Sequence, residues 1–192
     1  HGVPGAMVSV VCNNAMNRSV REFEITRPGE VLDKTKELVL EQFEKNAANP
    51  STERDETIKD GMDISICKVD TKNKSILWSG ANNPLWIIRN EELIEIKGNK
   101  QPVGKFDPSS NFTTHEVKVE SDDIFYIFSD GYADQFGGEK GKKLKSANFK
   151  KLLLSIQNEN MQKQKELIDE AFETWKGNLE QLDDVCLIGV RI

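Results

Sequence analysis

The hydrophobic positions of this chain change their spacing along its length, which predicts separate blocks of helix and strand. Apolar residues three or four positions apart predict helices over residues 5–17 and 28–45, and again around 149–156 and 168–175. Between these blocks the apolar residues form short runs or alternate with polar ones, as they do in β-strands. We expect strands near residues 64–69, 76–78, 85–88, 93–96, 115–120, 124–128 and 185–190.

Turn residues separate the first four of these strands and indicate how the strands pair. Turns at 70–74 and 80–84 predict an antiparallel meander. Because helices and strands fall into separate blocks, the predicted class is α+β with an antiparallel sheet. At the start, the Gly- and Pro-containing residues 1–5 predict a loop that leads into the first helix, and the polar stretch 46–60 predicts another loop. The predicted apolar stripe of the first helix consists of Met7, Val10, Val11 and Met16.

Length and composition restrict the classes of protein to consider. The 192 residues predict a single domain, 1–192, that can bury its own core. The net charge of −6 argues against a nucleic-acid partner, which usually meets a basic surface. No apolar run approaches the roughly 18 residues of a membrane span. The three widely spaced cysteines, Cys12, Cys67 and Cys186, are expected to be reduced and buried, so we expect a cytoplasmic protein or the cytoplasmic part of a larger membrane-associated sensor.

Aspartates stand at the ends of two apolar strands. Asp130 directly follows the strand 124–128, and Asp183 and Asp184 directly precede the strand 185–190. If the two strands are antiparallel neighbours, these carboxylates meet at one rim of the sheet, where oxygen ligands suit Mg²⁺ or Mn²⁺. The alternative is that Asp-Gly and Asp-Asp are ordinary turn sequences.

Four ordered sequence strings resemble one protein family. Residues 1–6 read HGVPGA, 80–85 read GANNPL, 128–131 read FSDG, and 183–185 read DDV. Their order and spacing resemble the SpoIIE/RsbU-type bacterial serine phosphatases, which belong to the metal-dependent PPM (type 2C-like) superfamily. The strings DGMD at 60–63 and YADQFGG at 132–138 resemble a subgroup found at the C-termini of multidomain sensor proteins. The resemblance covers essentially the whole chain.

This resemblance implies a fold, a reaction and a set of site residues. The implied fold is an α-β-β-α sandwich of two antiparallel sheets flanked by helices. The implied reaction is hydrolysis of phosphoserine or phosphothreonine by water activated between two Mn²⁺ or Mg²⁺ ions. Asp130 and Asp183 match metal-ligating aspartates, with Asp184 as a further ligand or a neighbouring group. His1, Gly2 and Gly131 match residues of the loops beside the metals.

The resemblance also implies what the chain lacks and which partners it meets. In the family, an aspartate that bridges both metals precedes the position of His1, together with the first strands of the fold. We therefore expect an N-terminally truncated domain that binds Mn²⁺ weakly and hydrolyses phosphoesters poorly. The implied partners are upstream sensor domains and a phosphorylated regulatory protein of the STAS (anti-anti-sigma) type. The alternative is a catalytically inactive phosphatase-like module that binds a partner or forms a homodimer.

A group of lysines follows the Asp130 string. Lys140, Lys142, Lys143 and Lys145 lie in the predicted loop 134–145. A solvated loop explains such a charge run, and an alternative is that the lysines attract a phosphorylated partner to the adjoining site.

Overall fold

The computed structural model describes residues 2–47 and 61–192, and these residues form two compact units. The first unit comprises the described parts of residues 1–82 together with 97–118, and the second comprises 83–96 and 119–192. Both contain helices and antiparallel sheet, so the predicted α+β class is confirmed. None of the helices among the described residues has the length and hydropathy needed to cross a bilayer.

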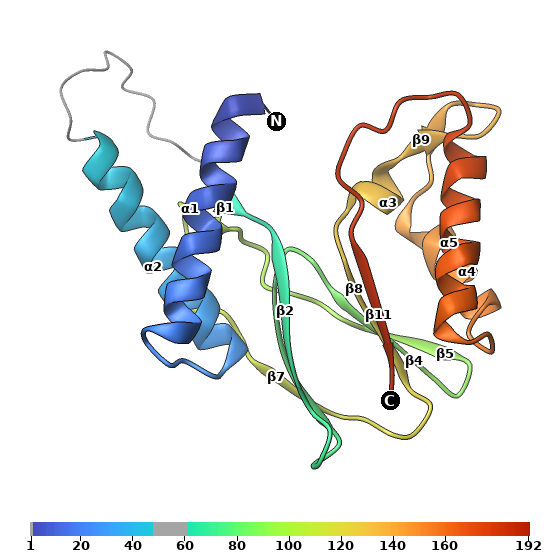
Figure 1. Cartoon of the computed structure of the whole chain (residues 1–192), viewed down its shortest axis with the longest axis horizontal. Coiled ribbons are helices and arrows are strands. Elements are labelled where there is room, and N and C mark those ends of the chain that lie inside the picture. Colours follow the sequence, from blue (N-terminus) through green and yellow to red (C-terminus); the bar gives the residue numbers. More distant parts are fainter. Residues whose placement is uncertain (1, 48–60) are drawn as a thin grey trace. The chain divides into compact units, whose positions relative to one another are not determined.

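The first unit packs helix α2 against a three-stranded antiparallel sheet and helix α1 against α2 (Figure 1). The sheet has the order β2-β3-β7. Val103, Ala81 and Leu32 are fully buried, and they form part of the apolar layer between α2 and the strands. The elements of this unit are α1 (Gly2–Arg21), α2 (Pro28–Ala47), β1 (Gly61–Met62), β2 (Ile64–Asp70), β3 (Ser75–Ala81), β6 (Val103–Gly104) and β7 (His115–Lys118).

Helix α1 differs from the sequence prediction in its start and in its buried face. It begins at Gly2, so the loop expected at the chain start is wrong for the described residues from Gly2 onward. Met7 and Val10 are 65% and 60% exposed, so the predicted stripe is wrong at these two positions.

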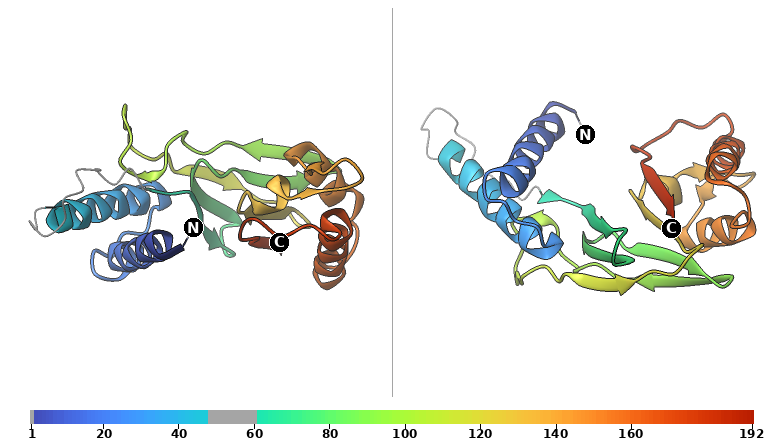
Figure 2. Two further views of the ribbon diagram at one scale, coloured as in Figure 1. Left: turned by 90° about the horizontal axis from the view of Figure 1, so that it is seen from above. Right: turned by 60° about the horizontal axis from the view of Figure 1, so that its bottom comes forward.

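The face that packs on α2 uses smaller side chains. Cys12, Ala15 and Ser19 are buried along α1, and the Ser19 hydroxyl lies 3.1 Å from that of Thr35 on α2. The two helices run side by side (Figure 2) and are in extensive contact with each other. Small side chains let helices approach closely. A prediction based on the spacing of large apolar residues does not detect such a face.

The second unit builds a four-stranded antiparallel sheet with helices α4 and α5 on one face (Figure 1). The strand order is β11-β8-β4-β5. Trp86, Tyr126 and Phe149 are at most 1% exposed and join the sheet to the helices. The elements are β4 (Leu85–Arg89), β5 (Glu92–Ile96), β8 (Ile124–Phe128), α3 (Gly131–Asp134), β9 (Phe136–Gly137), β10 (Lys142–Lys143), α4 (Ser146–Ser155), α5 (Met161–Lys176) and β11 (Leu187–Arg191).

The predicted meander is wrong at one connection. β2 pairs with β3 and β4 pairs with β5, as expected, but β3 and β4 belong to different sheets. Asn82, with a φ of 58°, ends the first sheet. Its N–H donates to the Asn99 carbonyl oxygen, at 2.9 Å, instead of continuing into a hairpin. Residues 80–84 therefore connect β3 of one sheet to β4 of another and do not form a hairpin turn.

Helix α5 begins and ends where its capping residues indicate. The Asn160 side chain accepts a hydrogen bond from the Lys163 N–H at 2.9 Å, which satisfies one of the free donors of the first turn. Gly177, with a φ of 56°, terminates the helix as the sequence predicted.

Candidate functional site

Strands β8 and β11 are antiparallel neighbours, which brings the sequence-predicted aspartates to one rim of the second unit. Leu187 is paired with Phe128, and the Ser129 N–H donates to the Cys186 carbonyl oxygen at 2.9 Å. Asp130 follows the end of β8 and Asp184 precedes the start of β11, so the pairing places both acidic segments at the same end of the sheet. The predicted adjacency of the two strands is thus confirmed.

The Ser129 hydroxyl ties the two segments together at the rim. It donates to the Asp184 carbonyl oxygen at 2.8 Å and accepts from the Cys186 N–H at 2.9 Å. A Cβ atom placed on Gly131 would lie 2.5 Å from the same Asp184 carbonyl oxygen. Only glycine therefore allows the chain after Asp130 to approach the Asp184 backbone this closely. The sequence prediction did not include Ser129, although its place between strand and aspartate in the FSDG string was visible.

The three aspartates differ in their surroundings. All three side chains are exposed. The Asp183 carboxylate accepts a hydrogen bond from the Asp184 N–H at 2.8 Å. The Asp183 carbonyl oxygen accepts one from the Gln181 side-chain amide at 2.8 Å. The Asp130 carbonyl accepts the Asp134 N–H at 3.0 Å and so opens the short helix α3. Asp183 is thus held at its backbone and at one carboxylate oxygen, and both acidic segments face solvent.

Two of the loop residues predicted beside the site, His1 and Gly2, stand at the start of the chain. His1 is outside the described residues, and Gly2 is the first residue of α1 in the first unit.

Cys186 is exposed, so the expectation of three buried cysteines is wrong for this residue. Cys12 is buried as predicted and Cys67 is half-buried.

The carboxylates at the rim are ligands of the kind that a divalent metal ion prefers, but there are too few of them among the described residues for a complete site. Carboxylate oxygens are the ligands that Mg²⁺ and Mn²⁺ prefer. Within residues 2–47 and 61–192, however, no three His, Cys, Asp or Glu side chains are grouped closely enough to hold a metal ion. Asp130 and Asp183 thus offer part of a ligand set.

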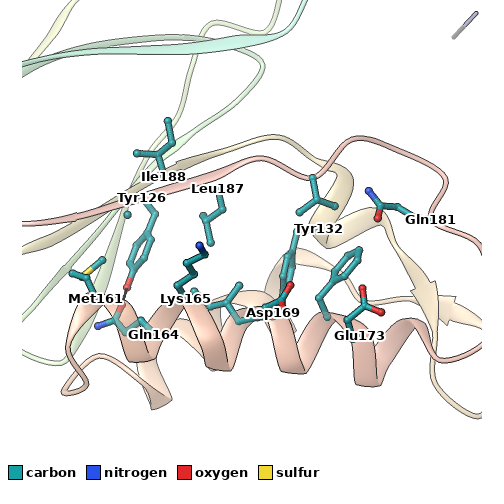
Figure 3. A pocket seen from close by; sticks show the side chains of 14 residues that line it. Tyr126, Tyr132, Met161, Gln164, Lys165, Asp169, Glu173, Gln181, Leu187 and Ile188 are labelled. Atoms are coloured by element: carbon teal, nitrogen blue, oxygen red, sulfur yellow. Dashed lines mark hydrogen bonds between the residues drawn. The ribbon is translucent and has the colours of Figure 1, made fainter.

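A cavity of about 610 Å³ lies between α5 and β11 in the second unit (Figure 3). Its lining mixes apolar residues, such as Phe172 and Leu187, with charged ones, such as Lys165 and Asp169. Its two tyrosine hydroxyls are used in the packing, because Tyr126 donates to the Gln164 side chain at 2.6 Å and Tyr132 donates to the Ile168 carbonyl at 2.9 Å. Burial raises the pKa of Tyr126 to about 12, and it raises that of Tyr132 as well. These phenols therefore stay protonated at neutral pH and serve the core.

Comparisons with known proteins identify the fold and the family. The family model of stage II sporulation protein E (SpoIIE) matches residues 1–192. A search of curated proteins finds no match. Among solved structures, the SiaA-PP2C domain of Pseudomonas aeruginosa is similar with a TM-score of 0.83 and 24% identity, covering 100% of this chain and 72% of that one.

Two further structures are similar at lower identity. The PP2C phosphatase domain of SpoIIE from Bacillus subtilis, solved with a fragment of its regulatory domain, has a TM-score of 0.71 and 16% identity, covering 100% of this chain and 51% of that one. The RsbU and RsbW domains of Rv1364c from Mycobacterium tuberculosis give 0.71 and 16%, covering 100% and 48%. The chain therefore spans about half the length of these two relatives. The shared fold and the matching family model confirm the resemblance stated from the sequence strings, and the chain belongs to the SpoIIE family, whose solved relatives are PP2C-like phosphatase domains.

Proposed function

We propose that this chain is the metal-dependent output domain of a bacterial signalling protein and removes phosphate from serine or threonine of a regulatory partner. The observation that carries the proposal is the rim of the second unit, where the Ser129 hydroxyl and the close approach of Gly131 hold the Asp130 and Asp183 segments together. The family model runs through both compact units, which supports treating residues 1–192 as one functional domain.

In this proposal Asp130 and Asp183 hold a divalent cation, Mn²⁺ or Mg²⁺, and Asp184 is a further ligand or orients its neighbour. The bound ion supplies an activated water and offsets the charge of the phosphate. Without a cation, the exposed carboxylates of the rim repel a phosphate dianion. The exposure of all three aspartates suits a phosphate carried on another protein. Use of manganese is supported by a relative, the SpoIIE phosphatase domain from Bacillus subtilis, which has been studied after soaking with Mn.

The partner is proposed to be a phosphorylated regulatory protein of the STAS type. One relative carries RsbU and RsbW domains in a single protein, and another comes from the bacterial stressosome, so both support a regulatory partner protein.

The test measures Mn²⁺ binding and phosphoester hydrolysis separately. Calorimetry on the chain is expected to show weak Mn²⁺ binding that weakens at least about tenfold in Asp130→Asn and Asp183→Asn. The matched control is Asp122→Asn, because Asp122 is exposed, lies before β8 and has a φ of 72°, which asparagine tolerates well. Unchanged Mn²⁺ affinity in both rim variants contradicts the proposed ligands.

Hydrolysis of p-nitrophenyl phosphate and of a phosphoserine protein is then compared between this chain and a longer version, extended by whatever residues its gene encodes before His1. We expect poor turnover by the chain and Mn²⁺-dependent turnover by the longer version, abolished by Asp130→Asn. Robust turnover by the chain alone contradicts the view that the described carboxylates are only part of the ligand set.

A second candidate function is a phosphatase-like module that binds a partner without hydrolysis. It is favoured by the absence of a three-residue metal cluster within the described part of the chain. A longer version that binds the phosphoprotein and leaves its phosphate intact supports this second candidate.

A further inference from the structure

The β9–β10 hairpin and the residues that follow it, 136–145, form a distinct basic feature of the second unit, here called the lysine hairpin. Gly137 is paired with Lys142 and Phe136 with Lys143. The tip, 138–141, is closed by a hydrogen bond from the Gly141 N–H to the Gly138 carbonyl at 3.1 Å. We propose that the lysine hairpin is the docking surface for an acidic segment of the phosphorylated partner protein. The inference rests on the proposed function and names the kind of partner sequence that the domain selects.

The charges of the lysine hairpin are available to a partner. Lys140, Lys142 and Lys145 are exposed, and none of them forms an ion pair with another described residue. Lys143 pairs with Asp134 at 2.7 Å, and Glu139 lies at the tip of the hairpin. Residues 134–145 thus contain four lysines and two carboxylates, in a chain whose net charge is −6. This local excess of positive charge attracts an acidic ligand to the hairpin of a chain that is acidic overall.

The hairpin is fixed in place by the C-terminal end of α5. The Gly138 N–H donates to the Trp175 carbonyl at 2.8 Å, and the Trp175 indole N–H donates to the Gln135 carbonyl at 3.0 Å. The buried Gln135 side chain in turn donates to the Glu180 carbonyl at 3.0 Å. A Cβ atom on Gly137 would overlap the Trp175 carbonyl oxygen, so the backbone contact admits only glycine. A surface held in this way loses little conformational entropy when it binds.

The hairpin also lies close to the proposed site along the chain. Only the four residues of α3 separate Asp130 from Gln135, a distance of about 7.5 Å along a helix axis. The end of the lysine hairpin, just after β10, is tied to α3 as well, because the Lys145 N–H donates to the Ala133 carbonyl at 2.7 Å. A partner whose phosphorylated side chain reaches the rim therefore brings its neighbouring residues near the lysines.

A protein ligand fits this surface better than a nucleic acid. Phe136 is 37% exposed beneath the Lys143 ammonium, which lies 5.9 Å from the ring centroid, so the patch offers apolar contact as well as charge. Nucleic-acid surfaces are usually broad and strongly basic, whereas the lysine hairpin is one short segment of a chain whose net charge is −6.

The test measures binding of fluorescein-labelled phosphoserine peptides by anisotropy, with the phosphoserine flanked either by Glu and Asp, by Gly and Ser, or by Lys. We expect the acidic-flanked peptide to bind most tightly, with an affinity that falls as salt is raised. The double variant Lys140→Glu/Lys142→Glu is expected to weaken its binding by about tenfold or more. The matched control is Lys151→Glu/Lys165→Glu, the same charge change at exposed positions of α4 and α5, which is expected to change binding less than about twofold.

Because binding is read without hydrolysis, failure of the inference and failure of the proposed function are distinguishable. If the hairpin variant and the control lose binding equally, or the acidic flank gives no preference, the docking surface is wrong whatever the phosphatase activity. If the preference is lost only in the hairpin variant, the docking surface stands even in a chain that leaves the phosphate in place. A single-stranded oligonucleotide that binds the hairpin more tightly than the acidic peptide overturns the inference in favour of a nucleic-acid site.

Discussion

Gly131 is the position where the smallest change should disturb the rim of the second unit most. In Gly131→Ala the new Cβ would lie 2.5 Å from the Asp184 carbonyl oxygen and 3.0 Å from its carbon, whereas ordinary contacts begin at 3.4 Å. The Asp184 backbone must therefore retreat by about 0.9 Å, and overpacking of this kind costs about 1–3 kcal/mol. The same retreat strains the 2.8 Å hydrogen bond from the Ser129 hydroxyl, which is worth about 1 kcal/mol.

An opposing effect must be weighed against this cost. Alanine is favoured over glycine in a helix by about 1 kcal/mol, and Gly131 is the first residue of α3. The clash outweighs this gain, so we expect a net loss of about 2 kcal/mol in the free energy of unfolding. For a chain of this size that corresponds to a thermal midpoint lower by about 4–8 °C.

Differential scanning calorimetry measures this shift, and Gly5→Ala is the matched control. Gly5 also lies in a helix, but a Cβ there would have nothing within 4 Å. We expect its midpoint to equal or exceed that of the unmodified chain because only the helix preference acts. A Gly131→Ala protein that melts at or above the unmodified midpoint refutes the reasoning from close approach.

Two further predictions concern acid stability and thiol reactivity. Burial raises the pKa of Asp123, but hydrogen bonds from Arg89 and from the Glu120 N–H outweigh burial and hold the pKa below its ordinary value. The stabilisation is therefore present above the ordinary Asp pKa and lost as pH falls through the lowered one. Urea unfolding should show stability declining below about pH 4, less steeply in Asp123→Asn, and an equally steep decline in that variant contradicts the assignment. Among the thiols, exposed Cys186 should react first with an aromatic disulfide reagent, because burial raises the pKa of Cys12 and raises that of Cys67 to about 11. Equal rates for Cys12 and Cys186 count against the described burial.

Local signals in the sequence predicted those elements whose structure depends on nearby residues. The spacing of Phe149 and Leu153 identified α4, and Gly177 marked the end of α5. The strand ends at Asp130 and Asp183 pointed to a common rim on the condition that the two strands are antiparallel neighbours, and the pairing of β8 with β11 meets that condition. The roles of these aspartates came from the family resemblance, since strand position alone also fits ordinary turns.

The sequence could not predict features that depend on distant partners. The buried face of α1 follows Cys12 and Ala15, because α2 approaches closely enough for small side chains to fill the interface. The turn after Ala81 looked like a hairpin, but Asn99, 17 positions beyond Asn82, accepts the hydrogen bond that diverts the chain. Such contacts are set by packing across the fold and leave no periodic pattern.

The rim depends on a single pairing between segments far apart in the sequence, and β11 stands at the end of its sheet order. Terminal strands open more readily than central ones, so amide hydrogens of β11 should exchange sooner than those of β4. Each opening separates Asp183 and Asp184 from Asp130 and dismantles the rim. A ligand that bridges these carboxylates would therefore hold β11 closed, and the binding free energy could be measured as slower hydrogen exchange in that strand.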